Sequence, residues 1–192
     1  MKAIVQRRYG SPDVLTLDDV DEPEPAPDEV KVRVRAASLN ARDLMMVFGP
    51  SPYGPKPGLI PLSDGAGEVI ACGSAVTDIA PGMRVVIPFR PGWIDGPFDP
   101  AAIATDLGGA VDGVLAEQVA VAARAVVPIP ASMSFEQAAT LPCAGVTAWA
   151  ALDRGAPVGP GHSVLVMGSG GVSLFALQIA RARGCRVIAT TS

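Results

Sequence analysis

A glycine-rich turn near the end of the sequence, Gly168-Ser169-Gly170-Gly171, has the composition of a phosphate-binding loop. Glycine at position 168 permits a tight turn, and the missing Cβ at position 170 lets a ligand's pyrophosphate approach the backbone. Free N–H groups at the start of a following helix would then bind the anion. The alternative is a tight turn without a ligand. The residues expected to bind the phosphates are Gly168, Ser169, Gly170, Gly171 and Val172.

The residues on both sides of this turn predict the elements that hold it. Val164 to Met167 are apolar and indicate a short strand buried on both faces. After the turn, Ser173 replaces the third glycine of the usual fingerprint and is small enough for close helix–strand packing. Apolar residues then recur at helical spacing up to Gly184, and Cys185–Thr190 follows as a second apolar strand. The sequence therefore predicts a βαβ unit with a glycine turn.

The residues before this unit predict short strands separated by turns, which is typical of a barrel-like sheet. Ser38 or Asn40 would cap a short helix over residues 41–48. Residues 89–112 are rich in Pro, Gly and Asp and are expected to be irregular; Trp93 and Phe98 there would line an apolar substrate cleft or only anchor the loop. The expected strands are Lys2–Arg7, Val14–Val20, Val30–Ala36, Gly67–Gly73, Met83–Pro88 and Val114–Val121.

Two domains are expected, 1–125 and 126–192. Ser134 and Gln137 have the spacing of a capping box, so a helix should begin there, and Pro142 should interrupt it. Two strands are too few for a doubly wound sheet, which needs about six, and bare apolar edges invite aggregation. We therefore expect the sequence to be part of a longer chain.

The overall composition excludes several classes of function. The sequence has 192 residues, 49% of them hydrophobic, and a net charge of −4. No basic cluster is present, which disfavours nucleic acid or an anionic membrane as a partner. No stretch has the length of a membrane span or the pattern of a signal peptide. Three widely separated cysteines, Cys72, Cys143 and Cys185, fit the reducing cytoplasm.

Four stretches, in the same order along the chain, resemble the medium-chain dehydrogenase/reductases. The stretches are the glycine turn with its helix and residues 37–43, 61–69 and 141–148. The resemblance implies an α/β plus β fold: a partly open β-barrel (GroES-like) catalytic domain, followed by the first βαβ unit of a Rossmann doubly wound sheet. It also implies an oxidoreductase that binds NAD(P) and, at full length, forms a homodimer.

The same resemblance argues against zinc. The zinc-using branch has a cysteine where Asn40 stands and a His-Glu pair where Ser63-Asp64 stands, so only Cys143 coincides with a metal ligand. Residues 89–112 lack the four cysteines of a structural zinc site. One thiolate cannot close a site that wants about four ligands. The resemblance therefore implies a zinc-free reductase, similar to the quinone oxidoreductases, with no metal site.

The resemblance also assigns roles to individual residues. Asn40 would face the nicotinamide and the substrate, Thr147 would contact the nicotinamide ring, and Tyr53 would donate a hydrogen bond to the substrate oxygen. Asn40 could instead be only a helix cap, and Tyr53 only loop packing. His162, the sole histidine, precedes the strand and is expected to be a surface turn residue, because ligands bind at the carboxyl ends of such strands.

The end of the second strand predicts the cofactor. An NAD site prefers an acidic residue there, whereas this sequence reads Ala189-Thr190-Thr191-Ser192. Thr191 and Ser192 could bond a 2′-phosphate, so NADPH is favoured over NADH. The expected activity is zinc-independent hydride transfer to quinones or α,β-unsaturated carbonyls. The alternatives are an alcohol dehydrogenase-like reductase of aldehydes or ketones, and a protein or inactive fragment that binds NADPH without catalysis.

Overall fold

The computed structural model describes residues 1–49, 51–54, 56–154 and 157–190. Its contacts divide the chain into two compact units, Met1–Pro142 and Cys143–Ser192. The division of the functional domains at residues 125 and 126 stays a prediction. None of the helices in these described ranges is both long and apolar enough to cross a membrane.

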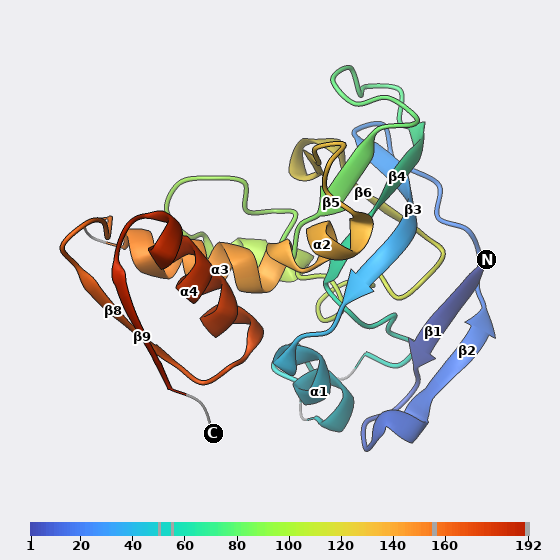
Figure 1. Ribbon diagram of the computed structural model, residues 1–192. Helices are drawn as coiled ribbons and strands as arrows, with labels where there is room; N and C mark the ends of the chain where they lie inside the picture. Colours follow the sequence, from blue (N-terminus) through green and yellow to red (C-terminus); the bar gives the residue numbers. More distant parts are fainter. Residues whose placement is uncertain (50, 55, 155–156, 191–192) are drawn as a thin grey trace. The chain divides into compact units, whose positions relative to one another are not determined.

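The first unit is built on antiparallel strands (Figure 1). A two-stranded sheet pairs β1 (Lys2–Gln6) with β2 (Leu15–Asp19). A five-stranded sheet has the order β6-β3-β4-β5-β7 and does not close on itself. Its strands are β3 (Glu29–Ser38), β4 (Asp64–Cys72), β5 (Arg84–Ile87), β6 (Gln118–Ala122) and β7 (Val127–Pro128).

Branched apolar side chains of this sheet make the main core of the first unit. Val30 and Val32 of β3, Val69 of β4 and Ile87 of β5 are fully buried and belong to one cluster. Such residues suit a pleated surface that is buried on one side. Strands β3 and β4 approach closely at Gly67, where an added Cβ would lie 2.1 Å from the carbonyl oxygen of Arg33.

The helices of the first unit are short. They are α1 (Ala41–Phe48), α2 (Phe135–Ala139) and three 3₁₀ helices, η1 (Pro12–Val14), η2 (Pro100–Thr105) and η3 (Ala123–Ala125). The capping box expected at the start of α2 is confirmed. The backbone N–H of Ser134 donates to Oε1 of Gln137 at 3.0 Å, and the N–H of Gln137 donates to Oγ of Ser134 at 3.2 Å.

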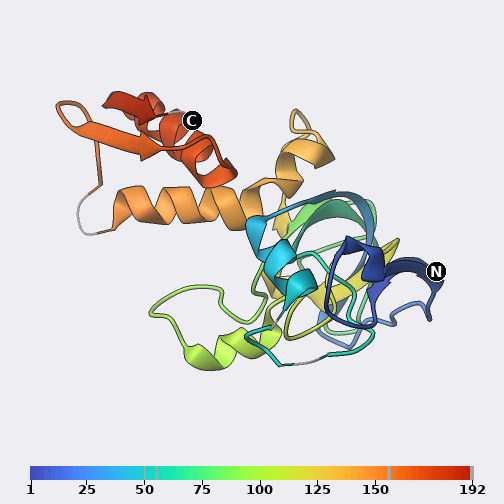
Figure 2. The ribbon, with the colours of Figure 1, turned by 90° about the horizontal axis from the view of Figure 1, so that it is seen from below.

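Three local predictions need correction. The strand expected over Val114–Val121 begins only at Gln118, because the N–H groups of residues 113–115 bond the carbonyls of residues 60–62 instead. The loop over residues 89–112 contains η2, whose start is capped by the Asp99 side chain; Figure 2 shows this segment in light green. The α-helix is interrupted before Pro142 as expected, since α2 ends at Ala139, but the chain stays helical: a π-helix, η4 (Leu141–Gly145), joins α2 to the next helix and accommodates the missing N–H.

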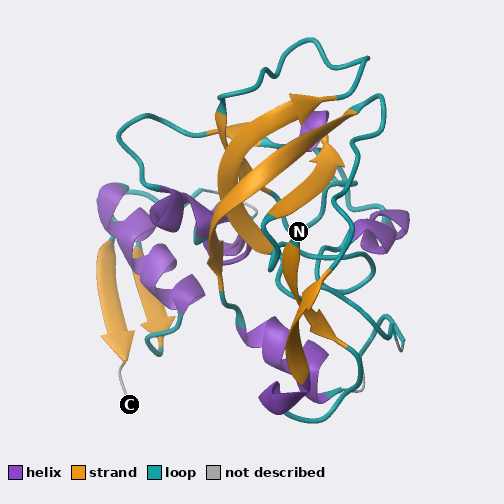
Figure 3. Cartoon of the chain, turned by 90° about the vertical axis from the view of Figure 1, so that its right-hand side faces the viewer, coloured by secondary structure: helices purple, strands orange, loops and turns teal. Residues whose placement is uncertain are grey.

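The second unit contains the expected βαβ arrangement. It consists of α3 (Val146–Asp153), β8 (Ser163–Met167), α4 (Gly171–Ala182) and β9 (Arg186–Thr190). Strands β8 and β9 are parallel and pair from Ser163–Arg186 to Met167–Thr190. Helix α4 packs on one side of the pair (Figure 3). The expectation that this strand is buried on both faces is wrong: Leu165 is 61% exposed and Met167 is 74% exposed, because among the described strands β8 and β9 pair only with each other.

Candidate cofactor turn and polar site

The glycine turn joins the end of β8 to the start of α4. Gly168 has φ of +79°, a left-handed conformation that favours glycine, and its N–H donates to the carbonyl of Thr190 at 3.1 Å. Gly170 is the N-cap of α4, with φ of −71°, and no side chain caps the helix. No side chain of the helix therefore accepts hydrogen bonds from the N–H groups of its first turn, and these donors are available to a ligand.

The space around this turn is open. A Cβ added at Gly170 would meet no heavy atom of the described residues within 4 Å, and its φ is one that any residue adopts. Neither packing nor backbone conformation therefore requires glycine at this position. Room for a group that approaches the backbone is the remaining reason, and a dinucleotide pyrophosphate at an uncapped helix start fits it.

Ser173 explains the departure from the usual glycine fingerprint. Its Oγ donates to the carbonyl oxygen of Met167 at 2.8 Å, which ties the first turn of α4 to the end of β8. The short side chain thus allows the close helix–strand contact and adds a hydrogen bond. Ser169 and Val172, which flank the turn's glycines, are exposed.

Of the other residues expected to contact the cofactor, the structure describes Thr147 but not Thr191 and Ser192. Thr147 is exposed on the first turn of α3, in the same unit as the glycine turn. Thr191 and Ser192 lie outside the described residues. Thr190 ends β9, and its hydroxyl oxygen accepts from the N–H of Gly168 at 3.3 Å. No acidic residue lies in β9 as described, Arg186–Thr190.

Asn40 is the N-cap of α1, as predicted; the alternative cap, Ser38, is the last residue of β3. The backbone N–H of Asn40 donates to Oδ2 of Asp43 at 2.7 Å, and the N–H of Asp43 donates to the carbonyl of Asn40 at 3.0 Å. Asp43 was not anticipated as a site residue. Its signal was an acidic residue three positions after a cap.

Two polar atoms of this turn are buried without a hydrogen-bond partner among the described residues: Nδ2 of Asn40 and Oδ1 of Asp43. Burial raises the pKa of the Asp43 carboxyl, and the hydrogen bond from Asn40 and the charge of Arg42 oppose that rise. Because buried polar groups normally find partners, each of these two atoms is expected to bind a water molecule or a polar group of a ligand.

Tyr53 belongs to a cluster around Asp106, which is fully buried. The Tyr53 hydroxyl donates to Oδ2 of Asp106 at 2.6 Å, and Nη2 of Arg90 donates to the same oxygen at 2.7 Å. Nε of Arg90 bonds the other carboxylate oxygen. Burial and the bond to Asp106 raise the pKa of Tyr53. A bond from Tyr53 to a substrate oxygen would thus replace the bond to Asp106.

At the positions expected to hold metal in the zinc-using branch, this chain has Asn40, Ser63, Asp64 and Cys143. Ser63 and Asp64 are fully buried, and Oγ of Ser63 donates to Oδ1 of Asp64 at 2.7 Å. Leu62, which precedes Ser63, has φ of +69°, a strained conformation that was not predicted from the sequence. Cys143 lies half-buried in η4. The described residues contain no cluster of three or more His, Cys, Asp or Glu suited to a metal ion.

The remaining sequence candidates are Trp93, Phe98 and His162. The rings of Trp93 and Phe98 meet edge to face with centroids 5.2 Å apart, and the guanidinium of Arg90 lies 5.0 Å from the Phe98 ring centroid. These contacts favour the anchor interpretation, although both aromatic side chains stay partly exposed. His162 is exposed in a turn before β8, as expected.

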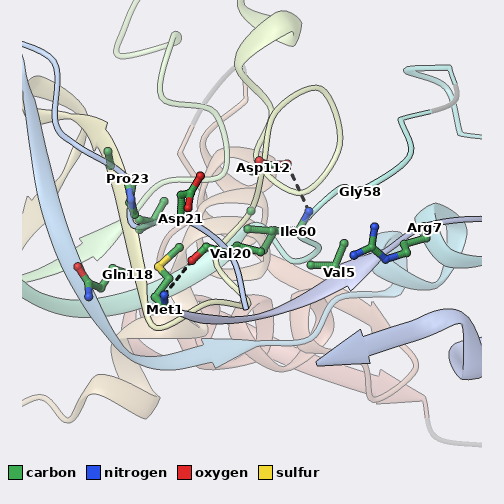
Figure 4. Close-up of a pocket in the computed structure, with 13 residues that line it drawn as sticks. Met1, Val5, Arg7, Val20, Asp21, Pro23, Gly58, Ile60, Asp112 and Gln118 are labelled. Carbon is green, nitrogen blue, oxygen red and sulfur yellow. Dashed lines mark hydrogen bonds between the residues drawn. The ribbon is translucent and has the colours of Figure 1, made fainter. Parts of the chain in front are cut away.

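A cavity of about 430 Å³ lies elsewhere in the first unit (Figure 4). Residues from β1, the segment after β2 and the start of β6 line it, with Met1, Asp21 and Gln118 among them. None of the site residues predicted from the sequence is among its described lining residues. This cavity is therefore separate from the polar site around Asn40.

Residues 26–131 match the family model of the alcohol dehydrogenase GroES-like domain. The chain belongs to this family. A zinc-type alcohol dehydrogenase-like protein of Schizosaccharomyces pombe is 40% identical over 195 residues, which cover 100% of this chain and 56% of that protein. A solved NAD-dependent alcohol dehydrogenase is similar with a TM-score of 0.87 at 40% identity, over 100% of this chain and 58% of that one.

A third relative is the quinone oxidoreductase of Escherichia coli, solved in complex with NADPH. Its TM-score is 0.77 at 29% identity, and the match covers 100% of this chain and 52% of that one. The GroES-like chain thus spans little more than half the length of these relatives. The medium-chain dehydrogenase/reductase superfamily expected from the sequence is confirmed, and so is the fold: a partly open GroES-like domain followed by the start of a Rossmann sheet.

Proposed function

We propose that this chain is the catalytic and first cofactor-binding part of an NADPH-dependent, zinc-independent oxidoreductase that transfers hydride to quinones or α,β-unsaturated carbonyls. The observation that carries the proposal is the open, uncapped turn between β8 and α4. A glycine at position 170 without a packing reason is expected where a pyrophosphate lies on the backbone.

The residues proposed to hold the cofactor are Gly168, Ser169, Gly170, Gly171 and Val172 through their backbone, and Thr147 at the nicotinamide. When bound, NADPH supplies the hydride for the reduction. The helix start supplies N–H donors and a positive dipole end toward the phosphates. The uncapped first turn of α4 supports this assignment.

Asn40 is proposed as the group that acts on the substrate. Reduction of a conjugated carbonyl or a quinone places negative charge on an oxygen, and a preorganised donor stabilises that charge. The buried, unpartnered Nδ2 of Asn40 supports this role, because within the described residues nothing else takes its hydrogen bonds. Tyr53 stays a second candidate donor, at the cost of its bond to Asp106.

The choice of NADPH rests on the end of β9. With threonine and serine in place of an acidic residue after Ala189, a 2′-phosphate meets no repulsion. The solved relatives differ, one being called NAD-dependent and one holding NADPH. Titrating NADPH and NADH into the purified protein and following fluorescence tests the choice: tighter NADPH binding is expected, and tighter NADH binding contradicts it.

Zinc independence is proposed from the side chains at the ligand positions. Asn40 and Ser63 replace a cysteine and the histidine of the zinc-using branch, and amide and hydroxyl groups are poor zinc ligands. The carboxylate of Asp64 and the thiol of Cys143 alone would fall short of the about four ligands that a zinc site wants. The test is turnover before and after dialysis against a chelator, with metal content measured by mass spectrometry. Unchanged turnover at less than about 0.1 zinc per chain is expected; activity that returns only with added zinc contradicts the proposal.

The second candidate is an alcohol dehydrogenase-like reductase of aldehydes or ketones, favoured by the names of two relatives. Turnover with a benzoquinone, an enone and a simple aldehyde, each at matched concentration, separates the two candidates. Higher kcat/KM for the quinone or enone is expected. NADPH binding without turnover on any of the three would instead favour the non-catalytic alternative. A cytoplasmic homodimer is proposed for the complete protein.

A further inference from the structure

We propose that Arg42 is a positioning residue for Asn40. Its side chain fixes the first turn of α1 to Leu107 directly and to the buried Asp106 through Tyr53. The inference rests on the function proposed above, since it concerns how the substrate-facing amide is held. Arg42, Tyr53, Asp106 and Arg90, which make up this cluster, are called the Asp106 cluster below.

Arg42 connects α1 to residues far away in the sequence. Its Nη1 donates to the carbonyl oxygen of Leu107 at 3.0 Å, and its Nη2 donates to the Tyr53 hydroxyl at 3.2 Å. Its guanidinium carbon also lies 4.6 Å from the centroid of the Phe89 ring. A guanidinium with two directed hydrogen bonds and an aromatic face has little freedom to move.

The partner of Arg42 is itself held in one orientation. The Tyr53 hydroxyl donates its hydrogen bond to Asp106, so its oxygen can accept a hydrogen bond from Arg42. Asp106 has no exposed surface, and Arg90 bonds both of its oxygens. A fully buried carboxylate that accepts three hydrogen bonds has little freedom to move, because losing any donor would leave its buried charge poorly compensated.

The fixed first turn is the one that carries Asn40. Arg42 stands between Asn40 and Asp43. The Asn40 N–H donates to the Asp43 carboxylate at 2.7 Å, and the Asp43 N–H donates to the Asn40 carbonyl at 3.0 Å. The helix is only eight residues long, so its own hydrogen bonds hold this turn weakly. The anchor at Leu107 and Tyr53 therefore decides where the unpartnered amide of Asn40 lies.

The experiment compares Arg42→Met in the wild-type and the Asn40→Ala background. Methionine keeps the apolar stem and removes the hydrogen bonds. In the wild-type background kcat is expected to fall about tenfold with KM for NADPH unchanged, because a small displacement of a catalytic group is costly. In the Asn40→Ala background the same change is expected to lower kcat by less than about twofold.

A second readout does not depend on turnover. Hydrogen exchange followed by mass spectrometry reports the opening of residues 40–46 directly. Arg42→Met is expected to accelerate exchange there by about fivefold or more, while exchange in β3 and β4 stays unchanged. Tyr53→Phe, which removes the acceptor of one Arg42 bond, is expected to produce a smaller acceleration in the same peptide.

Arg84→Met is the matched control. Arg84 also donates to backbone carbonyls, among them that of Met133 at 2.6 Å, and lies 4.4 Å from the Phe135 ring centroid. It holds the segment before α2 rather than α1. This variant is expected to lower the melting temperature while leaving both exchange over residues 40–46 and kcat close to wild type.

The outcomes separate the two proposals. An active enzyme in which Arg42→Met lowers kcat equally in both backgrounds, or leaves exchange over residues 40–46 unchanged, overturns the positioning role alone. A wild-type protein that reduces no quinone, enone or aldehyde overturns the proposed function and the positioning role that rests on it. Loss of the Arg42 effect in the Asn40→Ala background, together with faster local exchange, supports the inference.

Discussion

Gly67 and Gly113 of the first unit differ from Gly170 of the second in the space around them. In the first unit an added Cβ would lie 2.1 Å from the Arg33 carbonyl oxygen at Gly67, and 1.9 Å from the Leu62 carbonyl oxygen at Gly113. In the second unit an added Cβ at Gly170 would meet nothing within 4 Å among the described residues. The first two glycines are explained by the packing of the protein itself, whereas Gly170 is not.

The difference teaches how to separate a structural glycine from a ligand-contacting one. A crowded glycine is required for folding, whatever the protein binds. An open glycine with an ordinary φ is a candidate for ligand contact where it lies at an uncapped helix start, as Gly170 does and the equally open Gly159 does not. The same contrast holds for side chains, since Val32 and Val69 are fully buried in the first unit and Leu165 is 61% exposed in the second. Substitutions that add one methyl group test this comparison directly.

The largest effect is expected for Gly67→Ala. The new methyl group would overlap a backbone carbonyl between two paired strands, which cannot move without breaking the β3–β4 ladder. We expect the free energy of unfolding to fall by about 3 kcal/mol or more. Urea denaturation followed by circular dichroism measures the loss, and a midpoint equal to that of the wild type would contradict the crowded geometry.

The next effect is expected for Gly170→Ala, and it concerns binding rather than stability. The Cβ occupies open space in the free protein but would lie where the pyrophosphate approaches. We expect the Kd for NADPH to rise about tenfold to a hundredfold, with the melting temperature within about 2 °C of the wild type. Isothermal titration calorimetry and thermal denaturation measure the two quantities.

Gly159→Ala is the control for that prediction. Gly159 lies in the same unit, and an added Cβ there also meets nothing within 4 Å in the described structure, but it precedes β8 and is not part of the turn. This variant is expected to bind NADPH as the wild type does. If both variants bound NADPH normally, the open corner at Gly170 would have no part in cofactor binding.

A smaller loss is expected for Gly168→Ala, where the reason is the backbone. Gly168 has φ of +79° with nothing near its Cβ position, so the cost is the left-handed conformation alone. That cost is about 1–2 kcal/mol in the free energy of unfolding. Urea denaturation should therefore place this variant between Gly67→Ala and Gly170→Ala. Stability equal to that of Gly170→Ala would mean that the turn relaxes to another conformation.

What the sequence predicted well depends on local patterns. The strand, turn and helix around Gly168, the cap at Asn40 and the capping box at Ser134 are each set by residues within a few positions of one another. Periodicity and capping report such neighbours directly. The family resemblance added the order of the domains, and the comparison with known proteins confirmed it.

What the sequence did not predict depends on distant residues. Arg42 and the Leu107 carbonyl are 65 positions apart, and Tyr53 and Asp106 are 53 apart. No local sequence pattern in such a loop predicts contacts between residues so far apart. Asp106 was therefore missed, and Tyr53 was considered only as a donor to the substrate or as loop packing. The left-handed Leu62 was missed for the same reason, since its backbone lies close to Gly108 and Gly113, which are distant in the sequence.

The smallest effect concerns the buried carboxylate beside Asn40, and it extends the comparison to polar groups. Burial raises the pKa of Asp43 above its ordinary value of 3.8. An acid with a raised folded-state pKa contributes stability that is fully present below the unfolded pKa and is lost as pH rises through the folded value. Asp43→Asn removes this titration, and its side-chain oxygen can still accept from the N–H of Asn40. The wild type should therefore lose stability relative to this variant as pH rises from about 4 through the raised pKa of Asp43.

Glu136→Gln provides a control of opposite sign, because the pKa of Glu136 is lowered, first by its own backbone N–H and then by the Ser134 side chain. Its contribution is present above the unfolded pKa and is lost as pH falls, so the wild type should gain stability relative to this variant as pH rises. Urea midpoints of the three proteins, taken from below the lowered pKa of Glu136 to above the raised pKa of Asp43, measure both slopes. Slopes of equal sign would mean that the Asp43 carboxylate is stabilised in the folded state, and the orphaned acceptor beside Asn40 would then already have a partner in solution.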